Sequence, residues 1–424
     1  MIERKKGNIM KTELSSIEPL SFISGKVRNA SHKLLNRLPF LKRNALPHFM
    51  RTNIFRIEGS VKTSGSNLVT MFIGEKTAAY YFAFLVYSGK PEVKKVDNVP
   101  CTKIFAYPFT VSVDIVFIQT ERMFMEKLKN TGFTVMPKVN FVLDLSLVLD
   151  EIIKKMSRRR RRDIAKMEKY GYSYELAETG EALDFFYSKM YVPYIQTRHH
   201  EGAAVDSLHN LKKLFRKGGI LFVKRGGEYV AGILYHITGK IVHAHCLGIY
   251  DGAEQYLKEH AGQASLYFLI LWAKNQGFLE LDYGPTRPFL SDGTFMYKKE
   301  WGMKIRDQPN QSIYALKLCN FKKATRDFLL NNPFIFIDEI TMNGLMVMDK
   351  TLSPTELTRI CRTSCIPEIQ SFFVLTYSKG MLENYEEVLQ NLPASVRFSA
   401  EQIMKEGFSL QVHSFTLDDI YGKA

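Results

Sequence analysis

Between residues 52 and 145 the chain alternates short apolar runs with breaks at Gly, Pro or Asn. The runs are rich in β-branched and aromatic residues, which is typical of strands. We expect strands at 67–73, 79–87, 111–118 and 135–143. Helical spacing at 120–129, followed by Gly132, predicts one helix between the last two strands. This segment is therefore predicted to form a mixed α/β domain.

From residue 146 onward the pattern is one of helices and meandering strands. Asp144 or Ser146 is expected to cap a helix whose apolar residues lie on one face. Glycine-containing turns separate three strands, predicted at 220–224, 229–237 and 240–248. A further helix is predicted to open at 260–265 and to end at Gly277. These elements predict a second mixed α/β region.

The most informative stretch runs from residue 279 to residue 302. A short apolar strand reaches Asp282 and Tyr283 and breaks at a Gly-Pro pair, which favours a loop that presents side chains at a sheet edge. After an Asp-Gly turn signal, the stretch ends in Tyr-Lys-Lys-Glu-Trp-Gly. A lysine held between these rings would have a lowered pKa or would stabilise a developing negative charge. The alternative is an exposed loop with solvated lysines.

The two ends of the chain differ from its middle. Residues 1–50 are basic and irregular, and we expect a solvated arm; an amphipathic segment lying on anionic lipid is the alternative. After residue 353 the pattern restarts, with strands predicted at 372–377, 396–398 and 410–415 and helices at 383–391 and 400–407. A βαβαβ unit of this size is predicted to be an accessory or packing module.

Length and charge limit the choice of architecture and partner. A chain of 424 residues is long for a single core, so two or three domains are expected. We divide it into a basic arm at 1–50, a first half at 51–145, a second half at 146–350 and a small α/β module at 351–424. The net charge of +15 predicts an acidic partner: phosphate groups, nucleic acid or an anionic membrane surface.

Cysteine usage and hydropathy predict the compartment. The five cysteines are odd in number and mostly far apart, so no disulfide framework is expected. The N-terminus is charged and lacks the apolar core of a secretory signal, and the longest apolar run, 78–87, is too short to cross a bilayer. We expect a cytoplasmic protein without a transmembrane segment, at most peripheral to the inner face of the membrane.

Two further clusters have chemistry of interest. His243 and His245 share one face of a predicted strand, but no third ligand is evident, so we predict no metal site. An arginine run occupies 158–162 within a predicted helix, where five consecutive side chains point in all directions. Either these arginines are solvated, or one or two of them face a phosphate-bearing ligand.

Four segments carry a family resemblance, in this order: 141–171, 186–200, 261–284 and 292–302. Together they resemble the GNAT-like acyltransferase fold, in the branch shared by the Fem-type aminoacyl transferases and the GNAT-like proteins of exopolysaccharide and cell-surface loci. The resemblance implies an α/β (α+β) fold. It would contain two GNAT-like halves, with mixed central sheets flanked by helices, and the small C-terminal module.

The resemblance also implies catalytic residues. The Tyr297-Lys298 pair looks like the aromatic-Lys pair that places a lysine by the transferred carbonyl in Fem-type enzymes. Lys298 would then stabilise the oxyanion that forms when an amine attacks an ester or thioester. Asp282 and Tyr283 would face the cleft. The candidates for the base that takes the amine proton are Asp282, His199 and His200.

Substrate and cofactor contacts follow from the same resemblance. The implied substrate-binding residues are Arg158, Arg161, Arg162, Tyr194, Arg198, Arg287 and Tyr297. Residues 259–264 match the pyrophosphate loop of acyl-CoA-dependent GNAT enzymes in part: Gly262 and Ala264 fit, whereas Glu259 replaces a basic or amide residue. The implied cofactor-binding residues are Gly262, Gln263, Ala264 and Ser265. Acyl-CoA and aminoacyl-tRNA both stay open as the co-substrate, and the positive charge favours tRNA.

These features favour a GNAT-like N-acyltransferase. It would move an acyl or aminoacyl group to an amine on a phosphate-bearing or cell-surface polymer precursor. One alternative is an acetyl-CoA-dependent acetyltransferase of a small amine or a protein lysine. A second alternative is a catalytically silent basic protein that binds nucleic acid or a membrane.

Overall fold

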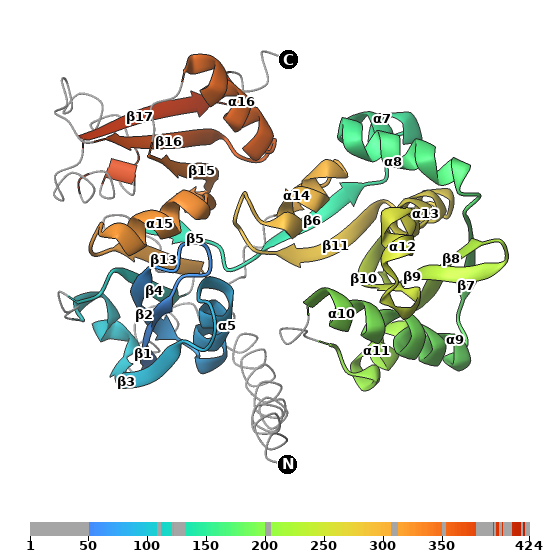
Figure 1. The fold of residues 1–424 in the computed structure, drawn as a ribbon, viewed down its shortest axis with the longest axis horizontal. Helices are drawn as coiled ribbons and strands as arrows, with labels where there is room; N and C mark the ends of the chain where they lie inside the picture. The colour runs from blue at the N-terminus through green and yellow to red at the C-terminus, as the bar shows by residue number, and fades with distance from the viewer. Residues whose placement is uncertain are drawn as a thin grey trace. The chain divides into compact units, whose positions relative to one another are not determined.

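The computed structural model describes residues 51–107, 112–120, 122, 132–199, 205–306, 313–349, 353–378, 393, 396–397, 401, 409–416 and 419. The chain divides into two compact units, Met1–Gln119 and Thr120–Ala424 (Figure 1). The division lies earlier than the predicted one at residue 145. The predicted arm at 1–50 and the helices predicted at 120–129 and 383–391 lie outside the described residues, as does most of the helix predicted at 400–407.

The first unit is built on four strands in the order β3-β1-β2-β4. Their bounds are β1 (Arg51–Ser60), β2 (Asn67–Gly74), β3 (Glu92–Pro100) and β4 (Ile115–Thr120). β1 pairs antiparallel with β2 and β3, and β2 pairs in parallel with β4. Helix α5 (Lys76–Val86) follows β2, and the short 3-10 helix η1 (Cys101–Ala106) follows β3.

Helix α5 corrects a prediction, because a strand was expected at 79–87. The described buried residues of the helix are Ala79, Phe82, Ala83 and Val86. Their spacing of three and four is that of one helix face, and strand side chains would alternate instead. The β-branched and aromatic content favoured a strand, but the burial of one helical face outweighs that weak preference.

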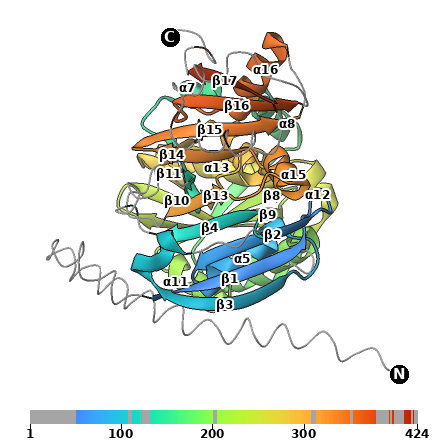
Figure 2. The ribbon, with the colours of Figure 1, turned by 90° about the vertical axis from the view of Figure 1, so that its left-hand side faces the viewer.

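The second unit contains two sheets. One has six strands in the order β17-β16-β15-β14-β5-β13, several of which lie side by side in Figure 2. Their bounds are β5 (Phe133–Val135), β13 (Ile313–Leu318), β14 (Phe334–Asp338), β15 (Thr341–Met348), β16 (Ser371–Ser378) and β17 (Ser409–Thr416). Helices α15 (Lys323–Asn331) and α16 (Pro354–Ser364) accompany them.

β16 pairs in parallel with β15, so the strands of the predicted C-terminal module share a sheet with residues before 350. Residues 396 and 397 are helical, not part of a strand.

The strand predicted at 135–143 is two strands, and they belong to different sheets. β5 ends at Val135 and pairs with β13 and β14, whereas β6 (Val139–Asp144) joins the second sheet. Pro137 lies between them. Proline has no N–H to donate to a ladder, so the chain can leave one sheet there and enter the next.

The second sheet has seven strands in the order β12-β6-β11-β10-β9-β8-β7. The remaining bounds are β7 (Ser173–Ala177), β8 (Gly218–Arg225), β9 (Glu228–Thr238), β10 (Ile241–Ile249), β11 (Glu280–Thr286) and β12 (Lys304–Arg306). The three predicted meander strands are confirmed by β8, β9 and β10, which pair antiparallel in sequence. This sheet and its helices agree with the predicted mixed α/β class.

Helices cover both faces of this sheet. They are α7 (Leu149–Lys155), α8 (Arg158–Lys169), α9 (Gly180–Phe185), the π-helix η3 (Phe186–Tyr191), α10 (Val192–His199), α11 (Leu208–Phe215), the 3-10 helix η5 (Tyr250–Gly252), α12 (Glu254–Lys258), α13 (Ala261–Asn275) and α14 (Gly293–Glu300). Leu221 of β8 packs in the core that contains α13, whereas its neighbour Phe222 packs in a second core with α9 and α11. The predicted cap of α7 was wrong: Val148 is the N-cap, and Asp144 instead accepts hydrogen bonds from Ser146.

The pairing of β10 with β11 is the one parallel pairing in this sheet and it is short. It joins Ile241 to Glu280, Val242 to Leu281 and His243 to Asp282. Beyond these residues β10 continues along β9, whereas β11 shifts register against β6 between Asp282 and Pro285. The two central strands therefore part at His243 and Asp282. Such a point exposes strand ends, where ligands bind in many α/β proteins.

In the parts of the chain described above, each helix is too short or too polar to cross a membrane.

A glycine in β10 allows the close packing of the π-helix on the sheet. A Cβ atom on Gly248 would lie 2.7 Å from Met190 Cβ and 2.9 Å from the Met190 carbonyl carbon. We expect Gly248→Ala to lower the free energy of unfolding by about 1–3 kcal/mol, because the backbone of η3 must move. Urea unfolding followed by tryptophan fluorescence measures this, since Trp272 and Trp301 both lie in the second unit.

The matched control is Gly180→Ala at the start of α9. A Cβ atom there meets nothing within 4 Å, so this change is expected to be neutral or to stabilise by roughly 0.5 kcal/mol. Equal unfolding midpoints for the two variants would contradict the packing described for Gly248.

Candidate active site

The aromatic and basic end of the 279–302 stretch is a helix, not an exposed loop. Asp292 is the N-cap of α14, and its Oδ1 accepts hydrogen bonds from the backbone N–H groups of Thr294 and Phe295 at 2.9 and 3.0 Å. The Asp-Gly signal therefore marks a helix start. The helix turns Phe295 and Lys298 inward, and Lys298 is only 3% exposed. The alternative of solvated lysines is wrong for this residue.

The ammonium of Lys298 binds two carbonyls of β11, next to the point where this strand shifts register against β6. Its Nζ donates to the carbonyls of Gly284 at 2.8 Å and Pro285 at 3.1 Å. The rings of Phe141 and Tyr283 lie 5.7 and 5.4 Å from Nζ. An ammonium has three N–H donors, and among the described residues these two carbonyls are its hydrogen-bond acceptors. One donor is left for a ligand.

Burial sets the acidity of Lys298. Loss of hydration lowers its pKa to about 8, and the carboxylates of Asp282 and Asp292 oppose this by favouring the charged form. At neutral pH the side chain is therefore mostly a buried cation. A cation with little surrounding water interacts more strongly with a developing anion than a solvated one does.

Asp282 is held from several sides. Its Oδ1 accepts from Asn140 Nδ2 at 2.9 Å and from the Gly284 N–H at 2.8 Å. Its Oδ2 lies 3.3 Å from His243 Nδ1 and 3.9 Å from Arg306 Nη1. Because both oxygens are engaged and the residue is buried, Asp282 is better placed to orient its partners than to take a proton from substrate.

A group of tyrosines lies on the other side of Lys298. Burial raises the pKa of Tyr283 well above its usual value, and a hydrogen bond with Tyr297 adds to this. Burial likewise raises the pKa of Tyr297 to about 12. Tyr194 on α10 is close enough to raise both values further. These hydroxyls stay protonated, so they act as hydrogen-bond donors and not as bases.

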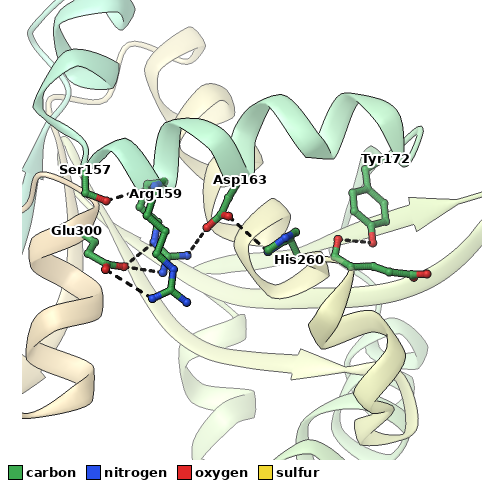
Figure 3. A network of polar contacts seen from close by, with 8 residues as sticks. Ser157, Arg159, Asp163, Tyr172, His260 and Glu300 are labelled. Atoms are coloured by element: carbon green, nitrogen blue, oxygen red, sulfur yellow. Dashed lines mark hydrogen bonds and ion pairs between the residues drawn. The ribbon is translucent and has the colours of Figure 1, made fainter.

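Arg160 is the buried member of the arginine run, and it was not among the predicted contacts. Its guanidinium binds Asp163 at 2.8 Å and Glu300 at 2.6 Å, and stacks over the Tyr297 ring at 5.1 Å. Figure 3 shows Glu300 of α14 meeting the arginine end of α8, with Asp163 on the far side. Asp163 in turn approaches Nδ1 of His260 at 3.7 Å. This chain of charges fixes the helix that carries Lys298.

The sequence does contain a signal for Arg160. Ile164 and Met167 are buried, and Arg160 precedes them by four and seven residues, so it lies on the same face of α8. The predicted contacts behave differently. Arg158 and Arg162 are exposed, and Arg161 is exposed and donates to the carbonyls of Lys154 and Met156.

Helix α13 begins where it was predicted to begin. The groups at its start that could bind a ligand are mainly backbone N–H groups, because most of the side chains there are buried. His260 adopts a left-handed conformation (φ 66°) and makes no side-chain cap, so the first N–H groups of α13 lack intrahelical partners. Ala264 and Ser265 are fully buried, and the Ser265 hydroxyl donates to the Ala261 carbonyl. A Cβ atom on Gly262 would approach Leu247 at 3.2 Å. Of the four predicted cofactor contacts, Gln263 alone has a partly exposed side chain.

The carboxylate of Glu259, which departs from the pyrophosphate-loop pattern, is neutralised. Arg225 forms an ion pair with it, and Gln255 donates to it at 3.3 Å. The Glu259 carbonyl accepts from the Tyr172 hydroxyl at 3.1 Å, a contact drawn in Figure 3. An anion at the start of α13 would therefore meet little repulsion from this side chain.

The remaining predicted residues are scattered. Arg198 is exposed and donates to the Tyr194 hydroxyl at 3.3 Å, and Arg287 pairs with Asp292 at 3.4 Å. The His199 side chain and all of His200 lie outside the described residues. Tyr194, Tyr283, Tyr297, Lys298 and Asp282 do come together.

The two strand histidines have different partners. His243 meets Asp282, whereas His245 lies 3.2 Å from Asp206. The ligand-type atoms of Asp206, His245 and Cys246 lie within 4.8 Å of one another. Burial raises the pKa of the Cys246 thiol to about 12, and a metal binds the thiolate, so we assign no metal to this group.

Comparison with known proteins adds one domain assignment. Residues 154–299 match the family model described as the acetyltransferase (GNAT) domain. No curated protein matched the sequence.

Several solved structures also matched this chain. FemX is 13% identical with a TM-score of 0.37, covering 61% of this chain and 83% of FemX. L-PGS from Bacillus licheniformis is 14% identical with a TM-score of 0.33, covering 66% and 85%. An acetyltransferase of the GNAT family from Colwellia psychrerythraea is 12% identical with a TM-score of 0.28, covering 49% and 65%.

The buried charges around Arg160 make a testable prediction about stability. Arg160→Met leaves Asp163 and Glu300 without their cation, and removal of one partner from a buried pair typically costs about 3–5 kcal/mol. We expect a loss of about 3 kcal/mol in the free energy of unfolding, because Glu300 is partly exposed. The control is Arg158→Met on the exposed side of α8, which should stay within about 0.5 kcal/mol of the wild type. Equal urea midpoints for the two variants would contradict the role given to Arg160.

Proposed function

We propose that this chain, whose residues 154–299 match the model of the acetyltransferase (GNAT) domain, is an N-acyltransferase that moves an acyl or aminoacyl group to an amine. The donor is a thioester such as acyl-CoA, or an aminoacyl-tRNA. The acceptor amine belongs to a phosphate-bearing molecule or a cell-surface polymer precursor. The observation that carries the proposal is the buried ammonium of Lys298 at the break of β11, inside this domain.

Lys298 fits the charge that develops in acyl transfer. When an amine attacks an ester or thioester carbonyl, the carbonyl oxygen becomes an oxyanion in the tetrahedral intermediate. Two donors of Lys298 are used by Gly284 and Pro285, so the third is held in a fixed direction and needs no reorganisation. Loss of one such donor in other enzymes lowers kcat by about 10²–10³.

The anionic part of the donor fits the start of α13. The free N–H groups of its first turn and the helix dipole favour a phosphate there. Arg159 of α8 is 72% exposed and only loosely paired with Glu300 at 3.8 Å, so its guanidinium is available to a phosphate. The net charge of +15 supports a polyanionic donor such as tRNA and transient contact with an anionic membrane.

A second candidate is an acetyl-CoA-dependent acetyltransferase of a small amine or a protein lysine. The description of the matching family as an acetyltransferase domain favours it. Either reaction fits the cytoplasm, where free thiols like the five here persist.

The variant Lys298→Gln tests the assignment. We expect transfer from acetyl-CoA or from mixed aminoacyl-tRNA to hydroxylamine, measured as hydroxamate, to fall about 10²–10³-fold in kcat with a smaller change in KM. The adjacent Lys299→Gln is the matched control, because Lys299 donates to the carbonyls of Arg362 and Thr363 at the end of α16. Equal activity in both variants would leave Lys298 a structural residue only. Absence of hydroxamate with wild-type protein and either donor would contradict the proposed function.

The same reaction should depend on pH in a defined direction. Lys298 donates only while protonated, and burial lowers its pKa to about 8. Activity is therefore expected to be present below pH 8 and to fall about tenfold per pH unit above it. Lys298→Arg keeps its charge at these pH values, so its residual activity should not fall there. Burial lowers the pKa of Lys299 to about 8 too, and Lys299→Gln should keep the decline. A decline unchanged in Lys298→Arg would contradict the assignment.

A further inference from the structure

A histidine–aspartate pair lies where the two central strands part. The parallel register sets His243 of β10 directly opposite Asp282 of β11, and His243 Nδ1 lies 3.3 Å from Asp282 Oδ2. If Nδ1 carries the hydrogen, it donates to the carboxylate and Nε2 presents a lone pair. Among the described residues none bonds to Nε2, and the side chain of His243 is 24% exposed.

The surroundings fix this imidazole. His236 of β9 stacks on His243 with ring centroids 4.5 Å apart and planes at 10°. Burial lowers the pKa of His236 to about 4, so at neutral pH its ring is an uncharged wall. Asp282 is itself held by Asn140 and by the Gly284 N–H. The carboxylate cannot turn away without losing both hydrogen bonds.

Several elements contribute the charged and titratable groups that surround the pair. Asp282 supplies the negative charge. The cations near it are Arg306 of β12, whose Nη1 lies 3.9 Å from Asp282 Oδ2 and which also pairs with Glu280, and Lys298 of α14. His245 of β10 and Lys217, which precedes β8, both lower the pKa of His236. His245 has Asp206 as its own partner.

We propose that His243 is the general base of the transfer reaction and that Asp282 is its positioning residue. This assignment rests on the proposed function. The amine nitrogen attacks the carbonyl carbon, and the carbonyl π electrons move to oxygen, where Lys298 donates. Nε2 of His243 then takes a proton from the ammonium of the tetrahedral intermediate. The C–S or C–O bond to the leaving group breaks, and the proton passes from the imidazolium to the departing thiolate or alkoxide.

The choice of acceptor separates this role from a structural one. The intermediate formed from a strongly basic alkyl amine keeps its ammonium proton at neutral pH and needs a base to lose it, whereas the intermediate formed from the weakly basic hydroxylamine loses that proton readily. We expect His243→Gln to lower transfer to the best alkyl amine of a panel about 100-fold or more, with a far smaller effect on transfer to hydroxylamine. Asp282→Asn should act in the same direction. The matched control is His245→Gln, a histidine of the same strand that also faces a carboxylate, and it should keep wild-type activity with both acceptors.

Each outcome decides between the claims. Equal losses with both acceptors in His243→Gln would make His243 structural and overturn the proposal, as would no loss at all. A wild type that acylates hydroxylamine but no alkyl amine up to pH 9 would also overturn it. If the wild-type protein forms no hydroxamate, the result contradicts the proposed function and not only the role of His243.

A spectroscopic measurement needs no substrate. Long-range ¹H–¹⁵N correlation on histidine-labelled full-length protein should show His243, identified by its loss in His243→Gln, with Nδ1 protonated and Nε2 bare at neutral pH. Asp282→Asn should alter this tautomer. A His243 that carries its hydrogen on Nε2 would contradict the proposal.

Discussion

The site depends on the hydrogen bonds that Lys298 makes to the carbonyls of Gly284 and Pro285. These two carbonyls lie where β11 shifts register against β6, and buried polar groups without partners are costly. The ammonium from α14 satisfies both, so a lysine can be buried at this point. Because these carbonyls need hydrogen-bond donors, the fold holds the Lys298 ammonium beside the point where β10 and β11 separate. Its third N–H group is left for a ligand.

The charges around this lysine explain why α14 stays in position. Glu300 lies two residues after Lys298 and binds Arg160 of α8, whose second partner is Asp163. A buried ion network contributes little net stability, because burying charges costs hydration free energy. It does fix the geometry of its members, because removing one of them leaves the others buried without a partner. We interpret the network as the support for α14, and Asp282 as the anion that lies near both Lys298 and His243.

The sequence was sufficient for the local pattern of the second sheet and for naming Lys298 as a candidate, but not for the tertiary contacts. Apolar runs separated by glycine-containing turns predicted β8, β9 and β10, and the family resemblance pointed to Lys298. The contact between His243 and Asp282 depends on strand order and register, which no local pattern encodes. Helix α5 was missed because aromatic content outweighed its spacing of buried residues, and α14 because its N-cap also looks like a turn.

The central claim is that the region of this chain that matches the GNAT domain model binds an activated acyl donor, and calorimetric titration tests it most directly. Full-length protein is titrated with acetyl-CoA and, separately, with aminoacyl-tRNA and uncharged tRNA at two salt concentrations. The account predicts saturable binding of one donor, retained in Lys298→Gln because that lysine acts mainly on the transition state. Binding of tRNA should weaken with salt and depend on the aminoacyl group. If the folded protein binds neither donor, the result contradicts the account.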